Sequence, residues 1–181
     1  IKNFLLMGNH FNIEFTLKNQ NRAGYFKLEI ANIFTPYFLD DKIKLKCILY
    51  AINLIKILTA ENESNKKIYF QIHKLFELLK SDHWFKKFIF WELEVIKHVG
   101  YDINFNDYFD TNKINKNDTY ISTQDGLKTI PSFLLKKDDT KTNINELKDG
   151  FKVVGDFLNK SVLIPNNINY PLSRNELFKL I

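Results

Sequence analysis

The chain has 181 residues, a formal net charge of +5 and 45% hydrophobic residues, which is enough for one domain or two small ones with a real core. No run approaches the roughly 20 apolar residues of a membrane-spanning helix. The apolar start, IKNFLLMGNHFN, becomes polar too soon for a secretory signal. Cys47 is the only cysteine, which excludes a disulfide framework and a thiolate zinc site and favours a reducing, cytoplasmic setting.

The basic residues are almost all lysines, with Arg22 and Arg174 as the only arginines. The abundance of Lys, Asn, Ile and Phe is typical of an AT-rich genome, which weakens any argument from the number of lysines. A basic surface is compatible with nucleic-acid binding, and the simpler alternative for each lysine cluster is a solvated face.

Two strands are predicted near the N-terminus. FNIEFTL, residues 11–17, alternates apolar and polar side chains, as a half-buried strand does. KNQNRAG supplies a turn, and YFKLEI follows as a second strand that ends at Ile30. Because two strands alone cannot bury a face stably, we expect them to belong to a larger sheet or barrel.

Three helices are predicted between residues 40 and 99. Asp40 or Asp41 can cap the first, which continues to Leu58 and is broken by ENESN. The second extends from about Asn65 to Leu79, with Ile68, Ile72, Leu75, Phe76 and Leu79 as its expected buried positions. Ser81 or Asp82 is expected to cap the third.

The third helix, ending at Val99, has apolar residues over more than half of its circumference. Such a helix packs on several sides, so we expect it to be the central element of a bundle. Gly100 is expected to end it with a left-handed cap.

The remainder of the chain is predicted as an insert followed by closing helices. Residues 101–142 are rich in Asn, Asp and Lys, and TYIST-QDG-LKTI suggests a small hairpin with Asp125-Gly126 at its turn. Asn143 or Asn145 opens another amphipathic helix, and Ser173 is expected to cap a last short one. The fold class is therefore α+β, mainly α.

The sequence contains no recognisable catalytic or nucleotide-binding motif. Its six glycines form neither GxGxxG nor GxxxxGK[ST], and there is no HExxH. The histidines of the helical region, His73, His83 and His98, lack metal-ligand spacing and are interpreted as structural or surface residues. Cys47 is interpreted as a small buried hydrophobe.

Glu92 and Glu94 lie two residues apart on the predicted central helix, so their side chains point to different sides and do not form an acid/base pair. Glu92 lies in the most apolar stretch. We expect it to pair with a lysine or to cap a neighbouring element.

Three basic pairs have aromatic neighbours. They are Lys66-Lys67 beside Tyr69-Phe70, Lys86-Lys87 beside Trp84-Phe85, and Lys136-Lys137 beside Phe133. Basic and aromatic side chains on one surface suit single-stranded nucleic acid. The alternative is that aromatic residues at helical spacing belong to the core.

The stretch FWELEVIKHVGYDINF, residues 90–105, resembles the signature of the bacterial DNA repair family RecO at Trp91, Glu92, Leu93, Gly100 and Tyr101. GNHFNIEFTL and AGYFKLEI, within residues 8–30, resemble the last strands of the family's N-terminal OB barrel. DGFKVVGDFL and PLSRNELFKLI are similar to its C-terminal helices, including Ser173-Arg174 and Leu177-Phe178. IPSFLL is similar to the cysteine-free, α-proteobacterial branch.

This resemblance implies a domain division and a function. Residues 1–32 would be the C-terminal part of an OB barrel, and residues 33–181 a helical domain with an insert at about 101–142. The family implies a non-enzymatic recombination mediator of the RecF pathway that binds and anneals single- and double-stranded DNA. Its implied partners are RecR, the acidic C-terminal tail of single-stranded DNA-binding protein and, indirectly, the recombinase RecA, and its implied location is the nucleoid.

The candidate DNA-binding residues are Arg22, Lys66, Lys67, Lys136 and Lys137. Lys86 and Lys87 are the candidates for the acidic tail, because Ile89 and Phe90 stand where relatives carry arginines. Many family members hold zinc through four cysteines, and residues 106–125 have none here, so we expect no metal and no cofactor.

Most of a five-stranded barrel is missing, which implies an N-terminally truncated chain. The alternative function is a non-catalytic helical scaffold or adaptor without DNA binding. A hydrolase with an unrecognised site has the least support, because no nucleophile, base or metal constellation can be named.

Overall fold

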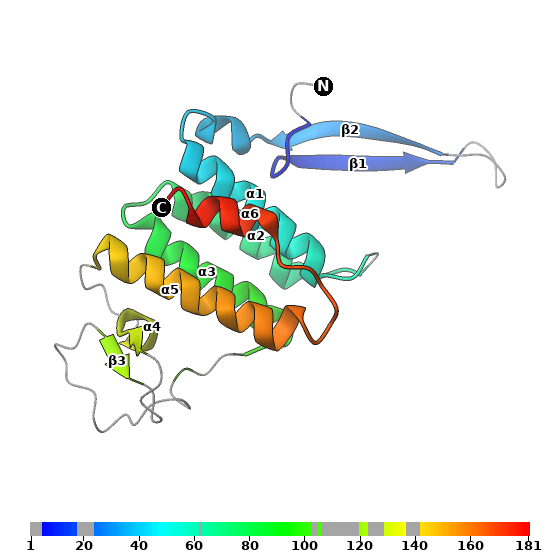
Figure 1. Cartoon of the computed structure of the whole chain (residues 1–181). Coiled ribbons are helices and arrows are strands. Elements are labelled where there is room, and N and C mark those ends of the chain that lie inside the picture. The colour runs from blue at the N-terminus through cyan, green and yellow to red at the C-terminus, as the bar shows by residue number, and fades with distance from the viewer. Residues whose placement is uncertain are drawn as a thin grey trace.

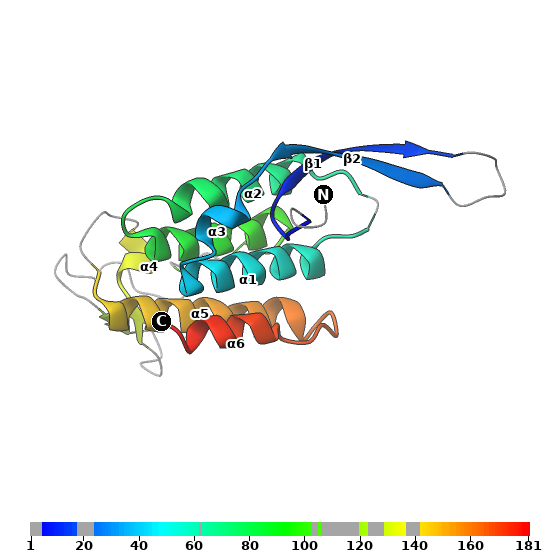
Figure 2. The same cartoon turned by 90° about the horizontal axis from the view of Figure 1, so that it is seen from above.

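A β hairpin projects beside a bundle of helices in the computed structural model of the chain (Figures 1 and 2). The structure describes residues 5–17, 24–61, 63–102, 105, 120–122, 129–136 and 142–181. Helices make up most of this part of the chain, and two small antiparallel sheets complete it. The predicted α+β, mainly α class is confirmed. The division at residue 32 stays a prediction.

The hairpin consists of β1 (His10–Thr16) and β2 (Tyr25–Asn32), paired antiparallel as predicted, with β2 extending two residues past Ile30. Phe11, Ile13 and Phe15 lie opposite Ile30, Leu28 and Phe26, so one face is entirely apolar. The predicted half-burial is wrong: Ile13 is 62% and Phe26 66% exposed, because no described element covers the outer part of that face.

A short clasp fixes the base of the hairpin to the bundle. Asn9 Oδ1 accepts hydrogen bonds from the backbone N–H groups of Phe34 and Thr35, at 2.9 and 3.1 Å, and the Thr35 hydroxyl donates to the Met7 carbonyl. Gly8 has φ +93°, and a Cβ there would lie 2.8 Å from Phe76 Cζ. Glycine therefore permits both the turn and the close approach. The 3-10 helix η2 (Thr35–Phe38) leads from this clasp into the bundle.

The first two long helices each begin after a capping side chain, and the cap of the first is one of the two residues that the sequence predicted. α1 (Lys42–Leu58) is capped by Asp41, whose carboxylate accepts from the N–H groups of Ile43 and Lys44. α2 (Lys66–Leu79) is capped by Asn65. Each cap satisfies N–H groups that the first turn of a helix leaves without a partner.

The start of α3 (Trp84–His98) corrects a prediction. Its N-cap is His83, in the left-handed region at φ 53°, and neither Ser81 nor Asp82 caps it. The Ser81 hydroxyl instead donates to the Leu78 carbonyl at the end of α2. The turn between the two helices is tight, so the residue with capping chemistry closes the earlier helix.

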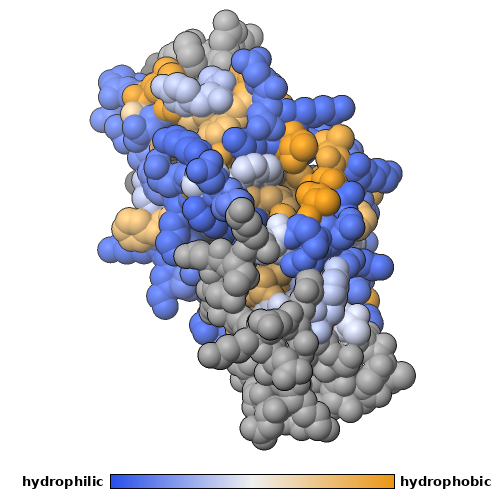
Figure 3. All heavy atoms as spheres, turned by 90° about the vertical axis from the view of Figure 1, so that its left-hand side faces the viewer, coloured by the Kyte–Doolittle hydropathy of each residue, from blue (hydrophilic) through white to orange (hydrophobic). Residues whose placement is uncertain are grey.

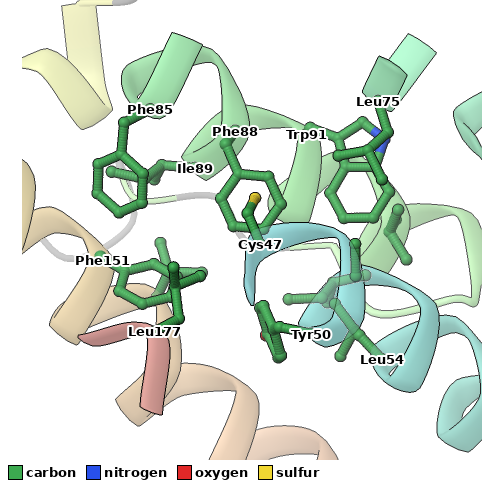
Figure 4. Close-up of a cluster of buried hydrophobic side chains, with 14 of the residues drawn as sticks. Cys47, Tyr50, Leu54, Leu75, Phe85, Phe88, Ile89, Trp91, Phe151 and Leu177 are labelled. Atoms are coloured by element: carbon green, nitrogen blue, oxygen red, sulfur yellow. The ribbon is translucent and has the colours of Figure 1, made fainter. Parts of the chain in front are cut away.

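α3 is the central helix, as predicted, since it packs against α1, α2 and α5. Figure 4 shows Phe88 and Trp91 of α3 around Cys47 and Tyr50 of α1, with Phe151 of α5 nearby. The buried α3 residues are Phe85, Phe88, Ile89, Trp91, Glu92, Val95 and Ile96.

Gly100 ends α3 with the predicted left-handed cap. Its φ is +100°, its N–H donates to the Lys97 carbonyl at 3.0 Å, and the Tyr101 N–H donates to the Ile96 carbonyl at 3.1 Å. These two bonds form a Schellman motif.

Gly100→Val is therefore expected to lower the free energy of unfolding by about 1–2 kcal/mol, the cost of placing a β-branched residue in the left-handed region. No atom of the described residues lies within 4 Å of the position of a new Cβ, so we attribute the expected loss to backbone strain. Urea unfolding measures it. Gly100→Asn is the matched control and should lose less, because Asn tolerates this conformation. Equal losses, or none, would contradict the cap.

The remaining elements close the bundle. β3 (Tyr120–Ser122) pairs antiparallel with β4 (Thr129–Pro131), which confirms the predicted pairing, although its turn at residues 125–126 lies outside the described part. The short helix α4 (Phe133–Lys136) follows. α5 (Ile144–Phe157), capped by Asn143 as predicted, continues into the π-helical segment η5 (Leu158–Leu163).

The last helix, α6 (Leu172–Phe178), packs on α1. Ser173 does not cap it: Pro171 occupies the N-cap position, and the Ser173 hydroxyl accepts from the Asn53 amide at 3.3 Å. In Figure 2, α1 lies between the α2–α3 pair and the α5–α6 pair. None of the described helices is long and apolar enough to cross a membrane.

The side that faces left in Figure 1 is shown in Figure 3. Its described residues are mainly hydrophilic, and its hydrophobic residues form separate patches.

Candidate nucleic-acid interface

Helix α2 presents two aromatic rings to solvent. Phe70 is 64% and Tyr69 44% exposed, and the two rings touch edge to face with centroids 6.0 Å apart. The buried side of α2 consists of Ile68, Gln71, Leu75, Phe76 and Leu79. Gln71 replaces the predicted Ile72, which is only half-buried. Positions 69 and 70 therefore fall outside the face that packs on the bundle.

The other two basic-aromatic clusters belong largely to the core. Phe85 is only 7% and Phe133 only 2% exposed. Lys86 Nζ lies 5.5 Å from the centroid of the Phe133 ring, and Lys44 Nζ lies 5.8 Å from that of the half-buried Trp84. Of the three clusters that the sequence suggested, the one on α2 has the most exposed aromatic pair.

Two exposed lysines accompany these rings. Lys66 and Lys67 occupy the first turn of α2, and neither forms an ion pair with another residue that the structure describes. Glu61 and Glu63, just before the helix, partly offset their charge. The exposed rings of Tyr69 and Phe70 therefore distinguish this face of α2 more than its net charge does.

Lys74 lies further along α2 and is already neutralised. Its ammonium group donates to Glu94 Oε2 at 2.9 Å, and the Gln71 amide donates to the same oxygen at 3.1 Å. Partial burial would raise the pKa of Glu94, but these two hydrogen bonds outweigh it and the pKa is lowered. The carboxylate thus stays ionised and paired with Lys74.

The predicted site residues do not all lie together on one described surface. Arg22 and Lys137 lie outside the described residues, and Lys136 is the last residue of α4. Lys86 and Lys87 lie in the first turns of α3, where Lys87 Nζ donates to the Ser81 hydroxyl at 2.9 Å. Because α2 and α3 are joined by a tight turn, this pair lies about 20 Å, the length of α2, from Lys66 and Lys67.

The histidines take structural or surface positions. His73 packs its ring against Phe34 and Tyr69, His83 is the N-cap of α3, and His98 lies in the last turn of α3. Within the described part, no three His, Cys, Asp or Glu side chains gather as metal ligands do. Most of residues 106–125 lies outside that part, so the prediction of no metal there stays a prediction.

Glu92 corrects another prediction, because it pairs with neither a lysine nor a helix end. It is fully buried, and it binds Arg174 through Nε–Oε1 at 3.0 Å and Nη2–Oε2 at 3.2 Å. The Tyr50 hydroxyl donates to Glu92 Oε1, and Arg174 also donates to the Phe151 carbonyl and the Tyr170 hydroxyl. Glu94 points to the other side, as expected. This network ties α1, α3, α5 and α6 together.

The electrostatics of this cluster are those of a closed structural pair. Burial raises the pKa of the Tyr50 hydroxyl, and the nearby Glu92 charge raises it further. Burial alone would lower the pKa of Arg174, but Glu92 outweighs it and raises that pKa. Cys47 is fully buried, which confirms its interpretation as a core residue, and burial raises the pKa of its thiol. We therefore assign these groups to stability.

A hollow of about 330 Å³ lies between α5 and α6. It is lined by Lys152, Asp156, Asn159, Tyr170, Arg174, Asn175 and Phe178. The charges of Lys152 and Asp156 oppose each other, and Arg174 is neutralised by Glu92. The hollow therefore offers no net attraction for a phosphate.

The chain is similar in sequence to proteins of one family. The family model described as "Recombination protein O C terminal" matches residues 39–162. The DNA repair protein RecO of Ehrlichia chaffeensis is 23% identical over 98% of this chain and 80% of its own length. The RecO proteins of Rickettsia peacockii and Rhodospirillum centenum are 24% and 21% identical, over 88% and 92% of this chain and 72% of their own lengths. No solved structure matches.

These matches define a DNA repair protein with a helical domain. The family model covers more than half of the chain, in the region of the helical bundle. The chain belongs to the RecO family. The matches include α-proteobacterial relatives, as the resemblance implied.

Proposed function

We propose that the chain is a non-catalytic recombination mediator of the RecF pathway, which binds and anneals DNA at the nucleoid and helps to load recombinase. The observation that supports DNA binding by this chain is the exposed pair Tyr69-Phe70 beside Lys66 and Lys67 on α2. RecR, the acidic tail of single-stranded DNA-binding protein and, indirectly, RecA are the proposed partners.

Base stacking and charge neutralisation are sufficient for DNA binding and annealing. Stacking of a base on an exposed aromatic side chain contributes about 1–3 kcal/mol, and it is tolerant of sequence because every base has a π face. Lysine ammonium groups neutralise phosphates and release counterions. Annealing requires no bond-breaking group, only a surface that lowers the repulsion between two backbones.

Lys66→Ala/Lys67→Ala is expected to weaken binding of a fluorescent oligo-dT about tenfold at low salt. The plot of the logarithm of the association constant against the logarithm of the salt concentration has a negative slope. The magnitude of that slope should decrease by about 1.4, because each phosphate contact to a single strand contributes about 0.7. Fluorescence anisotropy over a salt series measures both quantities. Thermal stability should stay unchanged, since both side chains are exposed.

The matched control is a variant with the same charge change elsewhere. Lys80→Ala/Lys97→Ala also removes two exposed lysines, which pair with Glu77 and Asp102 rather than standing beside the rings. It should retain most of the affinity. An equal loss in both variants would reduce the effect to net charge, and no binding by the folded wild-type chain would leave the helical scaffold as the better account.

The proposed peptide contact has its own test. Lys86→Ala/Lys87→Ala is expected to weaken binding of a peptide copying the acidic tail of single-stranded DNA-binding protein about tenfold at low salt, since exposed ion pairs contribute up to about 1 kcal/mol each. Titration calorimetry at two salt concentrations measures it, with Lys66→Ala/Lys67→Ala as the control. Undiminished binding would remove Lys86 and Lys87 from the peptide site.

A further inference from the structure

His10, the first residue of β1, connects the hairpin to the exposed face of α2. Its Nε2 lies 3.2 Å from the Tyr69 hydroxyl oxygen, and the two ring centroids are 5.8 Å apart at 73°. Its Nδ1 lies 3.4 Å from the amide nitrogen of Asn32 on β2. The His73 ring packs against both His10 and Tyr69, with centroids at 5.7 and 5.0 Å.

These partners determine the direction of each hydrogen bond. The Asn32 amide nitrogen can only donate, so His10 Nδ1 accepts. In a neutral imidazole the proton then lies on Nε2, which donates to the Tyr69 oxygen. The Tyr69 hydroxyl can still donate its own proton to a hydrogen bond, and no described residue accepts it. A hydroxyl that accepts one hydrogen bond is also a better donor of the next.

We propose that His10 is a positioning residue for DNA binding: it holds the Tyr69 hydroxyl as a hydrogen-bond donor to a phosphate oxygen of a strand bound on α2. Lys66 lies three residues before Tyr69 on the same side of the helix and neutralises the same stretch of backbone. Phe70, the more exposed ring, then stacks on a base. The inference rests on the proposed DNA binding and assigns separate tasks to the two aromatic residues.

The test uses the full chain and oligo-dT, with the dissociation constant as the readout. Tyr69→Phe removes the hydroxyl, keeps the ring, and should weaken binding about tenfold, as loss of a hydrogen bond to a charged group does. His10→Asn should weaken it similarly. His10→Gln should retain most of the affinity, because the Gln amide nitrogen reaches the place of Nε2 whereas the Asn amide reaches only that of Nδ1.

Two further comparisons isolate the mechanism. In the Tyr69→Phe background, His10→Asn should cause no further loss, because the hydroxyl through which it acts is absent. With an oligomer of abasic sites, Tyr69→Phe should weaken binding by the same factor as with oligo-dT, whereas Phe70→Ala should matter only when bases are present.

Additive losses from His10→Asn and Tyr69→Phe, or equal losses from His10→Asn and His10→Gln, would overturn the positioning role while leaving DNA binding intact. A wild-type chain that binds no oligonucleotide is recognised before any variant is made, and it would overturn the proposed function and this inference together.

Discussion

Replacing Arg174 with alanine is expected to lower the free energy of unfolding by about 3–5 kcal/mol, the usual cost of leaving one partner of a buried ion pair alone. The reason is Glu92, whose carboxylate has no contact with solvent and would keep only the Tyr50 hydroxyl as a donor. The Phe151 carbonyl and the Tyr170 hydroxyl would lose a partner as well. Urea unfolding followed by circular dichroism measures the loss.

The matched control removes both charges. Glu92→Leu/Arg174→Met replaces the pair with apolar side chains of similar volume, which in other proteins is often neutral or stabilising. We expect it to recover about 2–3 kcal/mol relative to Arg174→Ala. If the free energy of unfolding of Arg174→Ala lies within about 1 kcal/mol of the wild-type value, then water reaches Glu92 and the ion pair is not shielded from solvent.

Three of the residues that carried the resemblance, Trp91, Glu92 and Gly100, have structural roles in this chain. Trp91 donates its indole N–H to the Gln71 carbonyl at 2.7 Å, Glu92 holds Arg174, and Gly100 makes the left-handed cap. Each residue joins or ends an element of the bundle. These three residues, on which the resemblance in the sequence rested, therefore assemble the helical domain of this chain, and they say little about where DNA or a peptide binds.

Local chemistry made the helices predictable. Asp41, Asn65 and Asn143 cap the helices that follow them, because each needs only its own side chain and the next three N–H groups. Ser81 and Ser173 have the same chemistry but serve other partners, Leu78 and Asn53. Those partners were set by the tight turn after α2 and by the packing of α6 on α1. Neither feature is visible in a local pattern.

The features that could not be predicted from the sequence depend on long-range contacts. Glu92 and Arg174 are 82 residues apart, and no pattern in either segment indicates that the two side chains pair. One signal was available: Arg174 is one of two arginines in a lysine-rich chain, and a fork-shaped donor suits a buried carboxylate. The exposure of Tyr69 and Phe70 was equally out of reach, because it depends on which neighbours cover α2.

Gly155→Ala is expected to destabilise the chain, although alanine usually stabilises the interior of a helix by about 1 kcal/mol relative to glycine. A Cβ at Gly155 would lie 2.1 Å from Arg174 Nη1, 2.6 Å from Arg174 Cζ and 2.7 Å from the Tyr170 hydroxyl oxygen. The guanidinium cannot move aside without leaving Glu92. We expect a loss of about 2–4 kcal/mol, between the costs of overpacking a core and of breaking a buried ion pair.

The sign of this effect should reverse when the guanidinium is absent. In the Glu92→Leu/Arg174→Met background, methionine ends about where the arginine Nε lies, so the two atoms nearest to the new Cβ are gone. Gly155→Ala should then be neutral or stabilising by up to about 1 kcal/mol, as helix propensity alone predicts. Urea unfolding of the four proteins measures both steps. Destabilisation of equal size in both backgrounds would mean that Tyr170, rather than the ion pair, is what requires glycine at this position.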